Sequence, residues 1–213
     1  MGRHKLGILG GFKGKVGTVS GASWKGIEYI KGPNRGSSKP ATQAQIEARA
    51  KFRVVIRFLS QLGKLLKLGF KDSAIKMTGT NSAFQYNYKN ALQGLYPHYS
   101  LDYTKVLLTD GPLQQIVNPK AEATGGGLVK FSWEDNTGIK HANASDKSIL
   151  LVYCPEKGRF AYIDDGASRS SKTASINAGI FNGKTVETWL SFISADEKEV
   201  APSIYTGQLT VIA

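Results

Sequence analysis

The stretch ATQAQIEARAKFRVVIRFLSQLGKLLKLGFK, residues 41–71, carries the strongest pattern in the chain. On a helical wheel of about 100° per residue, its apolar side chains from Phe52 to Phe70 fall on one arc of about 200°. Thr42 and Gln45 have the spacing of a capping box, in which each side chain accepts a hydrogen bond from the other residue's amide. The pattern therefore predicts a helix that begins at Thr42. Gly63 costs about 1 kcal/mol inside a helix, and whether it splits the run stays open.

The opposite side of this predicted helix carries a narrow basic stripe made of Arg49, Arg53, Arg57, Lys64, Lys67 and Lys71. Such a stripe can neutralise the phosphates of a nucleic acid, because each neutralised phosphate releases counterions. An amphipathic helix must also expose polar side chains whatever the protein does, and Lys and Arg are common choices. We therefore keep two interpretations, a solvated face and an anion-binding face, and favour the solvated one.

Residues 1–40, which precede the helix, are rich in glycine and lysine. Val16–Ser20 and Trp24–Ile30 have the composition of short strands, and Gly21-Ala22 between them predicts a tight turn. This hairpin adds further candidate residues for binding an anionic partner, namely Lys13, Lys15, Lys25 and Lys31. The aromatic side chains of Trp24 and Tyr29 lie among these lysines and can stack on the bases of a single strand.

The chain after residue 71 changes from helical to strand-like patterns. Thr80-Asn81-Ser82 is expected to cap a second helix that runs through Leu92, before Pro97. From Ser100 onward short strand-like runs alternate with turn residues, which is typical of an antiparallel sandwich. The predicted strands are Asp102–Leu108, Gln115–Glu122, Leu128–Trp133, Ser148–Cys154, Arg159–Ile163, Lys172–Ile176, Glu187–Ser194 and Ile204–Ile212. Glu187–Ser194 alternates in the manner of a half-buried strand.

These patterns predict an α+β fold with two domains. Residues 1–99 are expected to form the basic hairpin and helical region, and residues 100–213 an antiparallel β-sandwich. The charge follows the same division, because residues 1–120 hold 19 Lys and Arg against 5 Asp and Glu, whereas residues 121–213 hold 9 against 11. The net charge of +12 therefore belongs to the front of the chain, which is expected to face an acidic partner.

The composition also restricts the protein's location. No apolar run approaches the roughly 20 residues that a membrane span needs, and the run from Leu6 to Leu9 is too short for a secretory signal. Cys154 is the sole cysteine, so no internal disulfide can form. We expect a cytoplasmic protein without a membrane span.

The sequence contains no complete motif for catalysis, cofactor binding or metal binding. Residues 10–15 (GGFKGK) approach a phosphate-binding loop, but Val16 stands where the Ser or Thr that holds magnesium is needed. Asp164-Asp165-Gly166 lacks the further acids of a calcium loop. The histidines and the cysteine could bind a metal ion, but they are far apart in the sequence, at His4, His98, His141 and Cys154. We predict a protein that is not an enzyme and has no cofactor.

The back half resembles the fibronectin type III and immunoglobulin-like sandwiches. Residues 128–133 (LVKFSW) are similar to their early strand with a core tryptophan, and residues 148–153 (SILLVY) to the central strand that follows. Residues 189–196 (WLSFISAD) and 203–205 (SIY) are similar to their late hairpin. The resemblance implies a scaffold for binding but does not fix what is bound.

A second resemblance covers nearly the whole chain. Its motifs are Gly2-Arg3 and the segments GILGGF at 7–12, GKVGT at 14–18, WKG at 24–26, KPAT at 39–42 with Gln45, RAKF at 49–52, LGFK at 68–71 and SIYTG at 203–207. These resemble a bacterial family catalogued only as a domain of unknown function. The resemblance implies one coherent unit and no particular chemistry.

The sequence therefore favours a non-enzymatic interaction or structural protein. Its basic helical region is expected to contact a protein partner or another copy of the chain. The alternative is a nucleic-acid-binding protein that places the helix stripe and the basic hairpin on phosphates.

Overall fold

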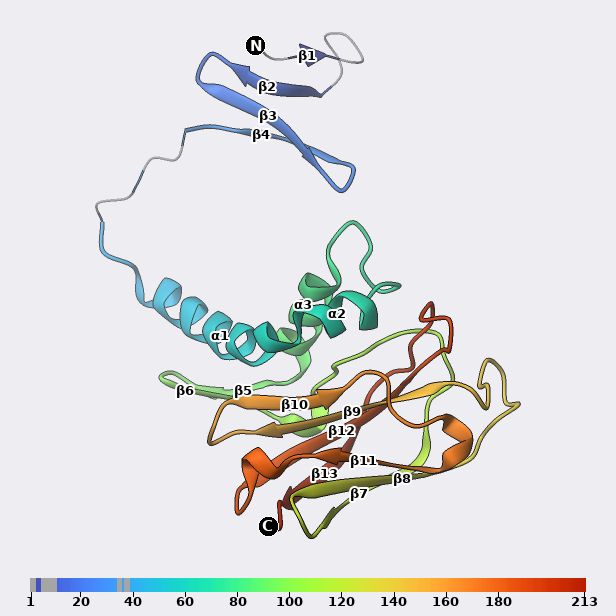
Figure 1. The fold of residues 1–213 in the computed structure, drawn as a ribbon. Coiled ribbons are helices and arrows are strands. Elements are labelled where there is room, and N and C mark those ends of the chain that lie inside the picture. The colour runs from blue at the N-terminus through green and yellow to red at the C-terminus, as the bar shows by residue number, and fades with distance from the viewer. Residues whose placement is uncertain (1–2, 5–10, 34–35, 37–38) are drawn as a thin grey trace.

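The computed structural model describes residues 3–4, 11–33, 36 and 39–213 (Figure 1). Gly2 and residues 7–10 of the opening motif lie outside the described residues, as do parts of the loop before the first helix. The fold is α+β with antiparallel sheets and a small helical segment, as predicted. Figure 1 shows the helices over one face of the C-terminal sheets, with the N-terminal strands apart from both.

The N-terminal strands form one antiparallel sheet, which we call the N-terminal sheet. Its strands, in spatial order, are β1 (Arg3–His4), β2 (Phe12–Val16), β3 (Val19–Trp24) and β4 (Ile27–Lys31). The predicted turn at Gly21-Ala22 is wrong, because these residues lie inside β3. The turns are at Gly17-Thr18 and Lys25-Gly26, where positive φ angles of 58° at Gly17, 51° at Lys25 and 80° at Gly26 reverse the chain.

Gly21 occupies the middle of a strand because another segment passes close to it. A Cβ atom at this position would lie 2.0 Å from the carbonyl oxygen of Phe12 and 2.7 Å from its ring. Only glycine permits this approach between β2 and β3, so the glycine that resembled a turn in the sequence marks a close backbone contact instead.

The predicted long helix exists but is divided. Helix α1 (Gln43–Leu59) is followed by a 3₁₀ turn at Ser60–Leu62 and by α2 (Gly63–Gly69), so the break falls just before Gly63. The capping box is confirmed: the Gln45 amide donates to Thr42 Oγ1 at 3.4 Å, and the Thr42 amide donates to Gln45 Oε1 at 3.2 Å.

Helix α3 (Gly79–Asn90) starts earlier than predicted. Thr78 caps it by accepting a hydrogen bond from the Asn81 amide at 3.2 Å, so Thr80-Asn81-Ser82 lies within the helix. At Gly79 an added Cβ would lie 2.4 Å from the Leu66 carbonyl oxygen, which shows how closely α3 packs on α2. After α3 comes a hairpin of β5 (Leu92–Leu95) and β6 (His98–Leu101), which the sequence patterns did not predict.

Two sheets make up the C-terminal part. Their strands are β7 (Val117–Thr124), β8 (Leu128–Glu134), β9 (Lys147–Cys154), β10 (Arg159–Ile163), β11 (Thr173–Asn177), β12 (Thr185–Ile193) and β13 (Ile204–Thr210). One sheet has the order β10-β9-β12-β13 and the other β11-β8-β7. Seven predicted strands are thereby confirmed. The eighth, Asp102–Leu108, is instead a 3₁₀ turn at Tyr103–Lys105 followed by irregular chain, with Asp102 accepting from the Thr104 amide at 3.2 Å.

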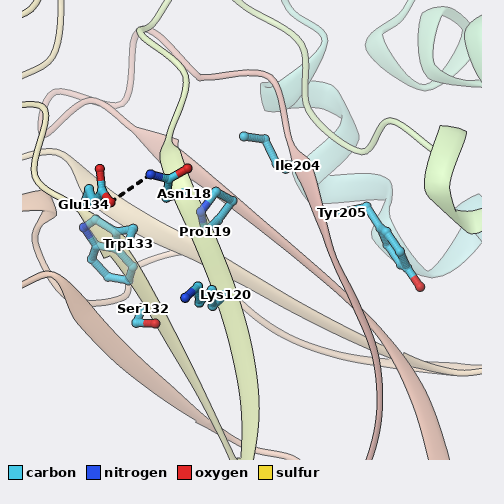
Figure 2. Close-up of a pocket in the computed structure, with 8 residues that line it drawn as sticks. All are labelled: Asn118, Pro119, Lys120, Ser132, Trp133, Glu134, Ile204 and Tyr205. Carbon is cyan, nitrogen blue, oxygen red and sulfur yellow. Dashed lines mark hydrogen bonds between the residues drawn. The ribbon is translucent and has the colours of Figure 1, made fainter.

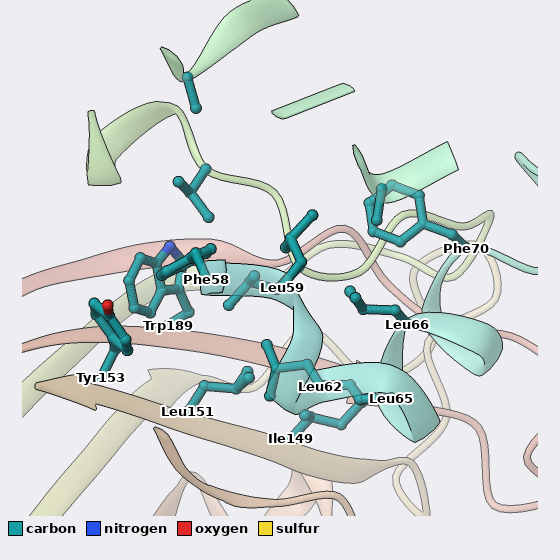
Figure 3. Close-up of a cluster of buried hydrophobic side chains, with 14 of the residues drawn as sticks. Phe58, Leu59, Leu62, Leu65, Leu66, Phe70, Ile149, Leu151, Tyr153 and Trp189 are labelled. Carbon is teal, nitrogen blue, oxygen red and sulfur yellow. The ribbon is translucent and has the colours of Figure 1, made fainter. Parts of the chain in front are cut away.

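Two hydrophobic cores share the four-stranded sheet between them. The inner core fills the space between the two sheets, with Phe131 of β8 opposite Leu190 and Phe192 of β12. The outer core lies between the four-stranded sheet and the helices, where Leu62 and Leu65 contact the sheet (Figure 3). Strand β12 is therefore buried on both faces, and the prediction that it is half-buried is wrong because the helices cover its second face.

The outer core joins residues from both ends of the chain. Phe58 of α1 stands edge-on to Tyr153 and Phe160, with ring centroids 4.8 Å and 5.0 Å apart. Trp189 of β12 completes this aromatic group, 6.2 Å from Phe58 (Figure 3). The helices are thus held to the sheet by side chains that lie about a hundred residues apart in the sequence.

A buried arginine ties the loops at one end of the two sheets together. The Arg169 side chain is 0% exposed and pairs with Asp146 at 3.0 Å. It also donates to Asn136 Oδ1 at 2.7 Å and to the Gln114 carbonyl at 3.1 Å. Its guanidinium lies 4.1 Å from the Phe192 ring centroid. Burial lowers the pKa of Arg169, and the neighbouring Asp146 carboxylate acts in the opposite direction.

Replacing Arg169 by Met is expected to lower the free energy of unfolding by about 3–5 kcal/mol, because the buried Asp146 carboxylate loses its partner. Urea denaturation measures this change. The control is Lys184→Met, which breaks the exposed pair with Glu156 and should cost less than about 1 kcal/mol. Equal costs for the two variants would contradict the structural role of Arg169.

Replacing Leu62 by Ala is expected to cost about 2–5 kcal/mol, because it leaves a cavity between the helices and the sheet. Far-UV circular dichroism and tryptophan fluorescence should still report one shared unfolding midpoint, since both parts contribute to this core. Ile75→Ala, at a side chain that is 77% exposed, serves as the control with a change below about 0.5 kcal/mol. Two separate midpoints for the helices and the sheets would contradict a shared core.

Candidate interaction surface

The first half of α1 extends past the sheet and is exposed on an apolar side. Ala48, Phe52 and Ile56 follow one another at helical spacing and, with Arg49 and Arg53, line a shallow hollow of about 530 Å³. We call these five residues the α1 strip. Phe52 is 50% exposed although its ring contacts that of Phe84 of α3, with centroids 4.9 Å apart and the ring planes tilted by 46°. The apolar arc predicted for this helix is therefore buried only from Val55 onward.

The basic stripe predicted on this helix is divided into separate environments. Arg49 and Arg53 border the α1 strip, and Arg57 lies at a second hollow of about 290 Å³ between α1 and the sheet, together with Tyr103 and Tyr153. Beyond the 3₁₀ turn, Lys64 pairs with Asp164 at 3.2 Å, and this hydrogen bond raises the pKa of Lys64. The last two members are exposed, Lys67 in α2 and Lys71 after it.

The register of the N-terminal sheet places particular side chains on one face. Lys15, Ser20 and Lys31 lie directly opposite one another on β2, β3 and β4. Because side chains alternate along a strand, Trp24 of β3 and Tyr29 of β4 point to the same face as this row. Lys31 Nζ lies 5.4 Å from the Tyr29 ring centroid, as expected for neighbours on one face. We call this side the lysine-aromatic face.

Two further predicted lysines of this region are exposed without belonging to that row. Lys13 precedes Gly14, whose φ of 99° interrupts the alternation of β2, and Lys25 lies in the turn before β4. The opposite side of the sheet carries Val16, Val19 and Ile30, which we call the apolar face. Ile30 is 65% exposed and Val16 48%. Within residues 11–33 the buried position is Gly21, so no hydrophobic core underlies this sheet in the described part of the chain.

The hairpin of β5 and β6 adds to the exposed apolar surface near α1. Leu95 and Tyr96 at its tip are 85% and 44% exposed. The hairpin lies beside α1, where Lys51 Nζ is 5.3 Å from the Tyr99 ring centroid. Exposed apolar side chains thus occur on the N-terminal sheet, on α1 and on this hairpin.

A further hollow lies between β7, β8 and β13 (Figure 2). Its volume is about 690 Å³, and Glu134 is the acidic side chain in its lining. Glu134 accepts a hydrogen bond from Asn118 Nδ2 at 2.8 Å, and the Trp133 indole donates to the Arg169 carbonyl at 2.7 Å. The lining therefore offers neither a nucleophile beside a base nor paired carboxylates, so it is a poor candidate for catalysis.

A buried carboxylate in the four-stranded sheet is also accounted for by its neighbours. Glu187 is 3% exposed and accepts hydrogen bonds from Tyr205 Oη at 2.5 Å and from Gln208 Nε2 at 2.8 Å. Burial and the hydrogen bond to Glu187 raise the pKa of Tyr205, and burial raises the pKa of Tyr103 to about 12. The Tyr205 phenol stays protonated at neutral pH, which suits its role as a donor to the buried Glu187 carboxylate.

The other titratable groups singled out in the sequence lie apart. Cys154 is buried in the inner core, whereas His98 at the start of β6 and His141 in a turn are exposed. His4 lies in β1, and its side chain is outside the described residues. Asp164 and Asp165 pair with different lysines, Lys64 and Lys147. Within the described ranges, no three His, Cys, Asp or Glu side chains form a group suited to a metal ion.

The described helices also include none that is long and apolar enough to cross a membrane. The segment that is similar to a phosphate-binding loop includes residues 11–15, which lie at β2. A turn into β3 follows them, whereas a nucleotide site needs a helix at this point.

Comparison with known proteins gives a family and no function. No curated protein matches the chain. A family model described as a family of unknown function (DUF6266) matches residues 11–207 of the 213, in agreement with the resemblance predicted from the sequence motifs. The chain therefore belongs to this family of unknown function.

Proposed function

We propose that the chain is a non-enzymatic assembly protein that associates with further copies of itself through its N-terminal third. The observation that supports this proposal is the concentration of exposed apolar side chains in that part of the chain. They are Val16, Trp24, Ile27, Tyr29, Ile30, Ile46 and Phe52. On the N-terminal sheet, Val16 and Ile30 lie on the apolar face, and Trp24, Ile27 and Tyr29 lie on the lysine-aromatic face. Exposed apolar groups bordered by polar residues are typical of interaction sites.

The N-terminal sheet in particular requires a partner surface. A small sheet gains stability when its apolar face packs against a helix or another apolar surface, and no such packing underlies this sheet within residues 11–33. Its apolar face, with Val16, Val19 and Ile30, matches the chemistry of the α1 strip. Residues 32–41 connect the two and can extend over about 33 Å. The sheet of one copy can therefore reach the α1 strip of a neighbour, and such exchange of a segment is a low-cost route to an oligomer.

The two C-terminal sheets act in this proposal as the rigid scaffold. Their orders, β10-β9-β12-β13 and β11-β8-β7, are compatible with a fibronectin type III-like sandwich in which β8 carries Trp133 and β9 is the central strand. Arg169 and its partners fix the loops at one end. Function then depends on what the scaffold holds in place, since such folds serve many binding roles.

Nucleic-acid binding by the helix stripe has less support than assembly. The 3₁₀ turn at Ser60–Leu62 divides the stripe, and Asp164 engages Lys64. Arg49 and Arg53 remain exposed, but they border an apolar hollow, which suits the rim of a protein interface.

Size-exclusion chromatography with light scattering tests the assembly proposal. Over a wide range of protein concentration the wild-type chain should reach a mass of at least twice 23.0 kDa, and Phe52→Glu should remain a monomer because a charge cannot be buried there without a partner. Raising the salt concentration should preserve or strengthen association, since the copies carry like charge.

The matched control is Ile75→Glu, which places the same charge at a side chain that is 77% exposed and outside the α1 strip. It should associate like the wild type. A wild-type chain that stays monomeric at every concentration would refute self-assembly.

A further inference from the structure

The lysine-aromatic face of the N-terminal sheet has the dimensions of a binding platform for an extended polymer. Adjacent strands lie about 4.8 Å apart, so the row of Lys15, Ser20 and Lys31 spans roughly 10 Å. Along β4, Tyr29 lies two residues before Lys31, which is a distance of about 7 Å. The face therefore presents cations at one end and aromatic rings next to them.

The cationic end of this face suits a phosphate. Lys15, Ser20 and Lys31 line a hollow of about 430 Å³ together with Gly17, Thr18, Gly32 and Pro33 of the adjacent turn and strand end. Among the described side chains of residues 11–33, Glu28 is the one carboxylate, and it stands on the opposite face beside Ile30. No ion pair involving Lys15 or Lys31 occurs in the described structure, so both charges are available to an anion.

The aromatic end suits unpaired bases. Trp24 is 43% exposed and Tyr29 is 38% exposed, and they stand on neighbouring strands of the same face. Exposed rings on a sheet beside cations can stack on successive bases while the cations hold the backbone. The bases of a duplex are already stacked on each other and unavailable to such rings, so the arrangement selects single strands.

We propose that the lysine-aromatic face binds single-stranded nucleic acid, with Lys15 and Lys31 on phosphates and Trp24 and Tyr29 stacked on bases. This function goes beyond assembly. It restricts nucleic-acid binding to the N-terminal sheet, whereas the sequence patterns assigned it to the helix stripe and the basic hairpin together. Recognition is tolerant of sequence, because stacking and charge contacts read the backbone and the base faces rather than the base edges. An acidic peptide would satisfy the lysines and leave both rings unused.

Fluorescence anisotropy of a labelled poly-dT oligonucleotide with the full-length chain tests this proposal. The oligonucleotide should bind more tightly than a duplex of the same length, and its affinity should fall steeply with salt. The Lys15→Gln, Lys31→Gln double variant should bind at least about tenfold more weakly and should reduce the slope of log affinity against log salt by about 1.4. Tyr29→Leu should weaken binding about five- to a hundredfold, whereas Tyr29→Phe, which keeps the ring, should bind like the wild type.

The matched control is the Lys120→Gln, Lys130→Gln double variant, which removes the same charge from exposed lysines of β7 and β8. It should bind like the wild type. An equal loss in both lysine variants, equal affinity for duplex and single strand, or equal affinity for poly-glutamate would overturn the proposal, as would equal binding by Tyr29→Leu and Tyr29→Phe.

Failure of this proposal can be distinguished from failure of assembly. Nucleic-acid binding weakens as salt rises, whereas association of like-charged copies does not. Measuring Phe52→Glu in both experiments separates them further, because Phe52 lies on the α1 strip and not on the lysine-aromatic face. This variant should lose association and still bind the oligonucleotide, and loss of oligonucleotide binding would show that the face does not act by itself.

Discussion

Burial of the apolar sides of α1 and α2 against the four-stranded sheet is the constraint on which the arrangement of the molecule depends. Leu62 and Leu65 lie in one buried cluster with Ile149 and Leu151 of β9 and Trp189 of β12 (Figure 3). This contact turns a sheet that has one core into a layer between two cores. It also determines which part of α1 remains free, because the buried residues of α1 begin at Val55 and the α1 strip lines a hollow at the surface.

The sequence patterns predicted most of the elements but not how they cover one another. Local patterns within short segments are sufficient to predict seven strands of the sandwich and the capping box at Thr42. These patterns are the alternation of apolar residues and the spacing of the capping residues. The burial of β12 on both faces depends on helices more than a hundred residues away. Sequence periodicity cannot predict the Arg169 network either, because the partners of Arg169 come from four separate loops and strands.

The candidate surfaces likewise combine features that the sequence predicts with features that only the structure shows. The basic lysines and exposed aromatics of the first forty residues could be recognised from composition, but placing the turn at Gly21-Ala22 gave a wrong register. A shift of register moves side chains to the other face of a sheet. Only the observed pairing shows that Lys15, Lys31, Trp24 and Tyr29 share a face. For the helix stripe, the sequence left open whether the run is split at Gly63, and the structure divides it with a 3₁₀ turn between α1 and α2.

The two proposed surfaces lie on opposite faces of the same small sheet, and this placement links them. Ordering a sheet that has no core costs conformational entropy, and this cost lowers the affinity of any ligand that binds either face. If a neighbouring copy covers the apolar face, the sheet is already ordered. A single strand then binds the lysine-aromatic face more tightly. The linkage is reciprocal, so nucleic acid in turn favours association of the copies. Several such faces in one oligomer also raise the effective concentration for a long strand, which strengthens binding without any new contact.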